Sequence, residues 1–170
     1  HARPAPEFQN RLAGLRRNRS GQQDRVGACA IPFLRLPDPE SAAQEGVIGL
    51  ALHPDFSNQP WVYLFYTLEK GGELVNRVSR FTFFSTPGQQ NQVDPASELV
   101  LVDNMPSPNG NHNAGDVQIG KDGHLYISIG EGGVASAARN EHVLTGKILR
   151  ITLDGNIPGD NPFLGPGTAR

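Results

Sequence analysis

The stretch Leu50–Thr67, LALHPDFSNQPWVYLFYT, carries the pattern that decides the fold. In its second half, Trp61–Thr67, an extended chain would place apolar side chains on both of its faces. A strand with two apolar faces is covered on both sides, as in stacked sheets. The first half contains His53-Pro54-Asp55-Phe56, in which Pro and Asp are typical of a chain reversal. We therefore expect a buried strand after a turn, and we interpret His53 as structural.

Short apolar runs surround this strand on both sides, separated by turns rich in Gly and Pro. The 170 residues include 20 Gly and 14 Pro. Frequent turns of Gly and Pro between short apolar runs are typical of an all-β protein. The further expected strands are Ile48–Leu52, Arg77–Phe84, Glu98–Val102, Asp116–Ile119, His124–Gly130 and Lys147–Leu153.

These runs form an internal repeat, in which three segments recur in the same order. LALHPDF (50–56), WVYLFYT (61–67) and RVSRFTF (77–83) are followed by VQIGKDG (117–123), HLYISIG (124–130) and GKILRIT (146–152). Repeated antiparallel sheets of three or four strands predict a β-propeller. An ordinary meander with similar hairpins is the alternative. Because propellers close with ~4–8 blades, we expect this chain to form only two to three blades of a larger ring.

Composition excludes several classes of protein. The formal net charge of -2 gives no global basic field for nucleic acid, and no apolar run reaches the ~20 residues of a membrane-spanning helix. The one cysteine, Cys29, excludes an internal disulfide framework and a Cys-rich zinc site. The start, HARPAPEFQN, shows no signal peptide and no initiator Met, as expected of a processed or excised chain. We divide the chain into an Arg-rich segment, 1–40, and a partial propeller, 41–170.

The stretch Asn109–Asp116, NGNHNAGD, is the richest in potential chemistry. It connects two expected strands and so lies at a sheet end, where functional sites are usually built. His112 has small and polar neighbours rather than an apolar packing partner, and an imidazole can accept the proton of an alcohol. The alternative is a turn in which Asn and Gly supply positive φ and His112 points into water. The spacing alone leaves both interpretations open.

A carboxylate follows at the end of a neighbouring strand, in Gly130-Glu131-Gly132-Gly133. If the strands at 116–119 and 124–130 form a hairpin, Glu131 lies at the same sheet end as His112, on the far side of one strand. A carboxylate hydrogen-bonded to an imidazole fixes its tautomer and raises its basicity. A plain turn with a solvated Glu131 is the alternative.

Several stretches, taken together, resemble the glucose/sorbosone dehydrogenase family. They are Gln44–Phe56, VYLFYT (62–67), the loop Asn111–Gly115, KDGHLYISIGEGG (121–133) and LTGKILRITLDGNIPGDNPF (144–163). The resemblance covers roughly residues 40–165, whereas residues 1–40 match poorly. It implies a six-bladed propeller in the parent protein, of which this chain is an N-terminal fragment. Members of this family are soluble quinoprotein sugar dehydrogenases that use pyrroloquinoline quinone (PQQ) and calcium.

The resemblance also implies roles for three residues. His112 falls where the family places the general base, which takes the proton of the sugar C1 hydroxyl as hydride moves to the quinone. Glu131 falls where the family has an Asp that holds this histidine, so its side chain is one methylene longer. Gln44 matches a glutamine near the substrate. Ala114 departs from the family, which usually has Gly or a polar residue there.

The implied protein is a PQQ- and calcium-dependent sugar (aldose) dehydrogenase, periplasmic or secreted, with a sugar and an electron acceptor as partners; a homodimer is left open. The family's catalytic Arg, most of its cofactor-binding residues and its calcium-binding carbonyls lie further along than this chain extends. A tricarboxylate quinone needs cations to hold it and a metal to polarise its reactive carbonyl. We therefore expect the isolated chain to be inactive, with unpaired blade edges.

Two alternatives come from other classes. The same fold resembles the hedgehog-interacting protein group, which would make this chain part of a non-catalytic ligand-binding propeller. A calcium-dependent hydrolase of the gluconolactonase kind is the third interpretation, and it would need several carboxylate or Asn metal ligands that converge on the axis.

Overall fold

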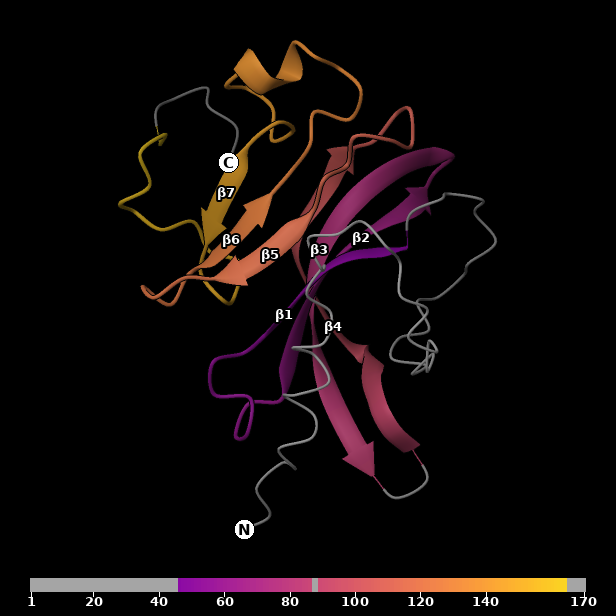
Figure 1. The fold of residues 1–170 in the computed structure, drawn as a ribbon, viewed down its shortest axis with the longest axis vertical. Coiled ribbons are helices and arrows are strands. Elements are labelled where there is room, and N and C mark those ends of the chain that lie inside the picture. The colour runs from indigo at the N-terminus through magenta and orange to yellow at the C-terminus, as the bar shows by residue number, and fades with distance from the viewer. Residues whose placement is uncertain (1–45, 87–88, 165–170) are drawn as a thin grey trace, which may run out of the picture.

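A computed structural model of the chain describes residues 46–86 and 89–164. Gln44, Cys29 and the Arg-rich segment 1–40 lie outside the described residues. The strands form two antiparallel sheets, one in the order β1-β2-β3-β4 and one in the order β5-β6-β7 (Figure 1). The elements are β1 (Val47–Leu52), β2 (Trp61–Lys70), β3 (Glu73–Thr86), β4 (Gln89–Pro106), β5 (Asp116–Ile119), β6 (Leu125–Ser128), the short 3-10 helix η1 (Ala137–Arg139) and β7 (Ile148–Ile151).

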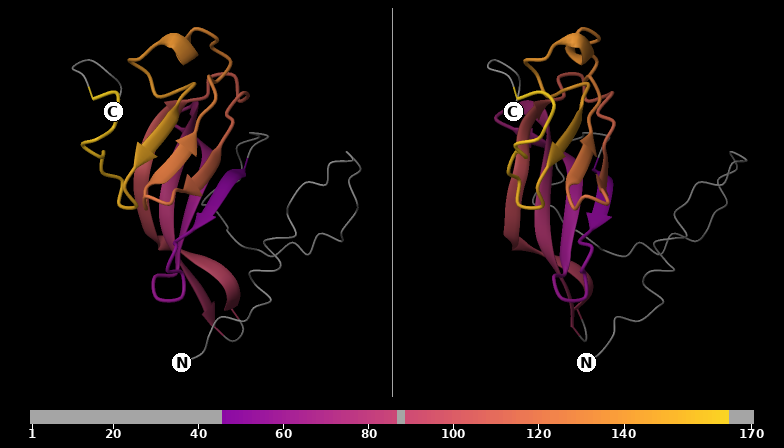
Figure 2. Two further views of the ribbon diagram at one scale, coloured as in Figure 1. Left: turned by 60° about the vertical axis from the view of Figure 1, so that its left-hand side comes forward. Right: turned by 90° about the vertical axis from the view of Figure 1, so that its left-hand side faces the viewer.

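The two sheets confirm the predicted repeat. Strands β1, β2 and β3 arise from the first set of matching segments, and β5, β6 and β7 arise from the second. Each set pairs as an antiparallel meander of neighbours in sequence. The sheets are therefore successive blades of the predicted propeller, and Figure 2 shows the second blade alongside the first. No helix in the described part of the chain has the length and apolarity needed to cross a membrane.

A two-residue turn joins β2 to β3. Lys70 pairs with Glu73 across this turn, and φ is positive at both intervening residues, 65° at Gly71 and 86° at Gly72. Positive φ at both turn positions matches the right-handed twist of paired strands. The Gly-Gly pair therefore closes this hairpin without strain.

Strands β3 and β4 are longer than the predicted Arg77–Phe84 and Glu98–Val102. Pairing between them continues past several register shifts. At one shift the backbone N–H of Thr82 donates to the Ser97 hydroxyl at 2.8 Å, in place of a backbone carbonyl. Because a bulge interrupts the alternation of the side chains, the pattern of apolar residues underestimated the length of both strands.

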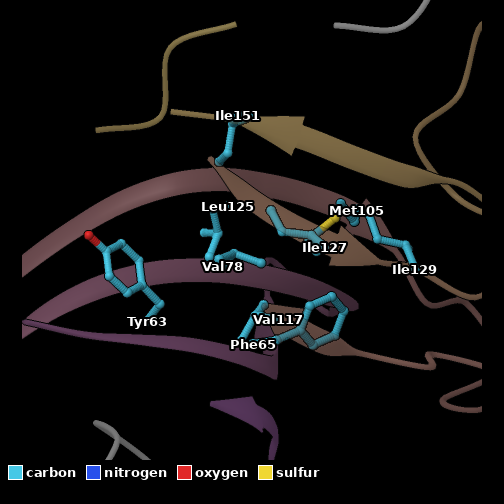
Figure 3. Packing of buried hydrophobic residues seen from close by; sticks show 9 residues of the cluster. All are labelled: Tyr63, Phe65, Val78, Met105, Val117, Leu125, Ile127, Ile129 and Ile151. Atoms are coloured by element: carbon cyan, nitrogen blue, oxygen red, sulfur yellow. The ribbon is translucent and has the colours of Figure 1, made fainter. Parts of the chain in front are cut away.

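Strand β2 is buried on both faces, as predicted from Trp61–Thr67. One face contributes Tyr63 and Phe65 to the core between the two sheets. The other face packs with residues of β3 and β4 in a second cluster: Val62, Leu64, Tyr66, Phe81, Phe83 and Val93. Figure 3 shows the core between the sheets: Tyr63, Phe65, Val78, Met105, Val117, Leu125, Ile127, Ile129 and Ile151. Burial of each large apolar side chain contributes ~1.5–3 kcal/mol, so this core holds the two sheets together.

Two glycines let the sheets approach closely at one end. A Cβ at Gly49 of β1 would lie 2.8 Å from the carbonyl oxygen of Gly115, which precedes β5. A Cβ at Gly115 would lie 2.8 Å from side-chain atoms of Ile48 and Phe65. These distances leave no room for a side chain. The loop that leads into β5 is thereby pressed against the first blade.

Candidate active site

The loop between β4 and β5 carries His112 and has an unusual backbone. His112 has a φ of 53° and Ala114 has a φ of 52°, both in the left-handed region. A residue other than Gly in this region costs ~1–3 kcal/mol and persists only where the surrounding structure enforces it. The turn interpretation assigned positive φ to Asn and Gly. The structure has it at Gly110 and Gly115, and also at His112 and Ala114. The conformation of this loop must therefore be held by its neighbours.

The segment that follows β6 is one of these neighbours. The N–H of Gly130 donates to the carbonyl of Asn113 at 2.9 Å, and the N–H of Gly132 donates to the carbonyl of His112 at 3.2 Å. A Cβ at Gly130 would lie only 1.8 Å from the His112 carbonyl oxygen. The β5–β6 hairpin thus brings the two loops together at one sheet end, and only glycine at position 130 allows this approach.

The structure brings His112 and Glu131 into direct contact. Nδ1 of His112 is hydrogen-bonded to Oε1 of Glu131. This hydrogen bond with His112 lowers the pKa of the Glu131 carboxyl from its usual value. In a neutral imidazole whose Nδ1–H is donated to an ionised carboxylate, Nε2 is the proton acceptor. Because the His112 side chain is 62% exposed, Nε2 can meet a hydroxyl group that arrives from solvent.

A buried chain of uncharged side chains lies beneath the His112 loop, and we call it the neutral cluster. Its members are Thr67, Asn76, Ser107 and Asn113, all of which are buried. Oδ1 of Asn113 accepts hydrogen bonds from Nδ2 of Asn76 at 3.0 Å and from the hydroxyl of Ser107 at 2.5 Å. The hydroxyl of Thr67 donates to Oδ1 of Asn76 at 2.8 Å. The neutral cluster therefore connects the loop to β2 and β3.

The residues of the neutral cluster were not among those predicted from the sequence. Thr67 and Asn76 are opposite each other in the β2–β3 register, and both face inward among apolar residues. Two polar residues at paired positions of buried strands are a usable signal, because buried polar groups need partners. Ser107 and Asn113 lie in a loop, where nothing in the sequence indicates burial.

Two further amides lie beside the segment that carries Glu131. A Cβ at Gly133 would lie 2.5 Å from Nδ2 of Asn109 and 3.0 Å from Oδ1 of Asn111. These amides come from the same loop as His112, and both residues are exposed. The sheet end therefore presents an imidazole, a carboxylate and two amides, which are groups that can hydrogen-bond a polyhydroxylated molecule.

The charge of Lys147, which precedes β7, is engaged within the chain. Its ammonium donates to the backbone carbonyls of Ala137 at 2.8 Å, Thr145 at 3.1 Å and Ala138 at 3.2 Å. Lys147 thereby fixes the segment that contains η1 and does not supply a cation for the carboxylates of a cofactor. In the two described ranges, no three His, Cys, Asp or Glu side chains converge on a metal position. The residues described around His112 thus fit a proton acceptor.

The predicted site is brought together only in part. His112 and Glu131 are in contact, while the third predicted residue, Gln44, lies outside the described residues. An apolar depression of about 770 Å³ lies elsewhere, along β7, and neither His112 nor Glu131 lines it.

Comparisons with known proteins place the chain in a family. The family model described as Glucose / Sorbosone dehydrogenase matches residues 14–170. Quinoprotein glucose dehydrogenase B of Acinetobacter calcoaceticus is 32% identical over 149 residues, which cover 72% of this chain and 30% of that protein. The PQQ-bound form of aldose sugar dehydrogenase from Streptomyces coelicolor has a TM-score of 0.63 at 28% identity, covering 81% of this chain and 37% of that chain.

A relative with a different name is also similar. The HIPL2 protein of Arabidopsis thaliana is 27% identical over 189 residues, which cover 80% of this chain and 27% of that protein. The chain thus spans less than two fifths of the length of each of these relatives. Because the family model matches nearly its whole length, the chain belongs to the glucose/sorbosone dehydrogenase family.

Proposed function

We propose that this chain is part of a PQQ-dependent sugar dehydrogenase in which His112 removes the proton of a sugar hydroxyl. The observation that carries the proposal is the contact between Nδ1 of His112 and the Glu131 carboxylate, on an imidazole that is 62% exposed. An oriented imidazole with a free Nε2 at a sheet end is the arrangement of a general base. The names of the quinoprotein relatives support the choice of reaction.

In this proposal each side chain has one role. A sugar hydroxyl hydrogen-bonds to Nε2 of His112, and its proton moves to that nitrogen as the bond from carbon to hydrogen breaks. Glu131 keeps the ring in the correct tautomer and stabilises the imidazolium that forms, because its negative charge is already at Nδ1. PQQ, when bound, would accept the hydride that leaves the same carbon.

Other parts of the proposed function rest on the family resemblance. Gln44 would contact the substrate, and residues beyond this chain would bind PQQ and calcium. The protein would be periplasmic or secreted and would pass its electrons to a separate acceptor. The isolated chain would be inactive, since a proton acceptor alone does not oxidise a sugar.

The test is dye reduction by aldoses in the full-length protein with PQQ and calcium. His112→Ala should lower kcat/KM by ~10²–10⁴-fold, the usual contribution of a general base. Its matched control is His124→Ala, because His124 also lies against a carboxylate, with Nδ1 3.2 Å from Asp122, at another place in the blade. The control should keep its activity. Unchanged turnover in His112→Ala would overturn the assignment.

A non-catalytic ligand-binding propeller remains the second candidate, and the similarity to the HIPL2 protein favours it. A binder needs neither the imidazole nor its carboxylate. Titration of the full-length protein with PQQ in the presence of calcium separates the two candidates. Saturable binding supports the dehydrogenase, whereas no change in quinone absorbance supports the binder.

A further inference from the structure

The neutral cluster has no part in the proposed proton transfer, yet it lies directly beneath the residue that performs it. Asn113 follows His112 in sequence and is only 2% exposed, whereas the side chain of His112 is 62% exposed. Consecutive residues of one loop therefore face opposite ways. One points into solvent and the other into the protein.

The backbone on both sides of Asn113 is strained. Its neighbours His112 and Ala114 have φ values of 53° and 52°. A strained loop relaxes unless other contacts make the relaxed conformation still less favourable. The Asn113 side chain supplies such contacts, since its Oδ1 accepts from both Asn76 and Ser107.

Both donors are themselves held in place. Ser107 is fully buried and its N–H donates to the carbonyl of Leu74 at 3.0 Å, while Asn76 lies within β3 and accepts from Thr67. If the loop relaxed, two buried donors would lose their acceptor, at a cost of ~1–3 kcal/mol each. That cost is of the same size as the strain of the two left-handed residues.

We propose that Asn113 is a positioning residue whose buried amide, anchored by Ser107 and Asn76, holds His112 in its left-handed conformation against Glu131. A shift of about 1 Å in a catalytic group can cost on the order of 10²-fold in rate. The structural half of this inference stands on the hydrogen bonds alone. Its effect on turnover rests on the proposed function.

The experiment compares two serines in the full chain. Ser107 and Ser79 are both fully buried, and each hydroxyl donates to a side chain, at 2.5 Å from Ser107 to Asn113 and at 2.7 Å from Ser79 to Glu98. Ser79 lies on the face of β3 opposite to that of Asn76. Ser107→Ala and Ser79→Ala therefore each remove one buried hydroxyl, and only Ser107 is attached to the His112 loop. The Ser79 hydroxyl also contacts that of Tyr66 at 3.1 Å. Asn113→Ala is the stronger variant, and Ser107→Ala keeps the test usable if Asn113→Ala does not fold.

The readout is the contact between His112 and Glu131, followed through the carboxyl titration of Glu131 by ¹³C NMR. The hydrogen bond with His112 holds the pKa of Glu131 below its ordinary value, so a displaced imidazole should raise it. Ser107→Ala should raise the pKa of Glu131 and leave the protein folded. Ser79→Ala should lower the free energy of unfolding without moving this pKa.

Kinetics then separate this proposal from the proposed function. With PQQ and calcium, Ser107→Ala should lower kcat on the order of 10-fold with little change in KM, whereas Ser79→Ala should leave both unchanged. An unchanged Glu131 titration in Ser107→Ala, or equal shifts in both variants, would overturn the positioning role. If the Glu131 titration responds but the wild-type full-length protein shows no PQQ-dependent turnover, the positioning role stands and the proposed function fails.

Discussion

Strands β2 and β3 carry a polar cluster on each face, and the two clusters differ in charge and exposure. The neutral cluster lies on the face toward the second blade, beneath the His112 loop. The opposite face carries what we call the charged cluster: Tyr66, Lys70, Arg77, Ser79, Glu98 and Asp103. The two are interleaved in sequence, since Tyr66 precedes Thr67 and Asn76 precedes Arg77. One strand pair thus supports two kinds of polar network.

The charged cluster ties β2, β3 and β4 of the first blade together. Asp103 of β4 accepts from Nε of Arg77 at 3.0 Å and from Nζ of Lys70 at 2.8 Å. Although partial burial opposes it, hydrogen bonds from Arg77 and Lys70 hold the pKa of the Asp103 carboxyl well below its usual range. Glu98 accepts from the hydroxyl of Tyr66 at 2.5 Å. These groups respond to pH and salt, whereas an amide or hydroxyl of the neutral cluster does not.

The difference shows what each network can do. The ion pair of Asp103 with Lys70, whose side chain is 46% exposed, contributes ~0–1 kcal/mol. A buried polar group left without its partner costs ~1–3 kcal/mol. A site whose geometry must stay constant over a range of pH is better supported by uncharged groups. The neutral cluster lies beneath the candidate base, and the charged cluster holds the strands behind it.

The largest expected effect comes from forcing the His112 loop away from the neutral cluster. In Gly130→Ala the new methyl group would lie 1.8 Å from the His112 carbonyl oxygen. The loop must move, so we expect the free energy of unfolding to fall by at least ~3 kcal/mol, as for severe overpacking. Urea denaturation measures this loss.

Gly159→Ala is the matched control, because a Cβ at Gly159 has no heavy atom within 4 Å. It should change stability by less than ~0.5 kcal/mol. Equal losses in the two variants would show that the two loops separate at little cost, and the neutral cluster could not then hold His112 in place.

The strands and the partnership of His112 with Glu131 were predictable from sequence, and the support beneath them was not. Alternation and the repeat located each strand of the described ranges, although β3 and β4 only in part, since core patterning is local. Hairpin pairing put Glu131 at the same sheet end as His112, and the family resemblance implied that the two side chains meet. The burial of Asn113, in contrast, depends on contacts with β3 and with the loop after β4, which come together only in the folded chain. Local sequence cannot reveal it.

A smaller effect is expected from titration of the charged cluster at high pH. Burial, together with the hydrogen bond to Glu98, raises the pKa of Tyr66 from 10.0 to about 12. The Tyr66 hydroxyl ionises at lower pH in the unfolded chain than in the folded protein. Its contribution to the free energy of unfolding is therefore fully present below pH 10.0 and is lost as the pH rises towards 12. A shift of this size corresponds to ~2–3 kcal/mol. The free energy of unfolding measured across this pH range should show the decline. In the folded protein, the phenolate absorbance of Tyr66 should appear at higher pH than that of an ordinary tyrosine.

Tyr66→Phe should remove this part of the pH dependence. The neutral cluster should be unaffected in both proteins, so the Glu131 titration should be the same with and without the Tyr66 hydroxyl. If the free energy of unfolding of Tyr66→Phe falls with pH as steeply as that of the wild type, the decline belongs to other groups. Tyr66 would then not be the group that makes the charged cluster sensitive to high pH.

The smallest expected effect separates the clusters by their response to salt. Thr67→Val keeps the shape of the side chain and removes the 2.8 Å hydrogen bond to Asn76, at a cost of ~1 kcal/mol. Lys70→Met removes an ammonium whose side chain is 46% exposed, which should cost less than ~1 kcal/mol. Mobile ions screen exposed charges and leave buried neutral hydrogen bonds alone. Unfolding at low and at high salt should therefore show a constant loss for Thr67→Val and a shrinking loss for Lys70→Met. A salt-dependent loss in Thr67→Val would mean that the two faces of β2 are electrostatically coupled, and the separation of the two networks would fail.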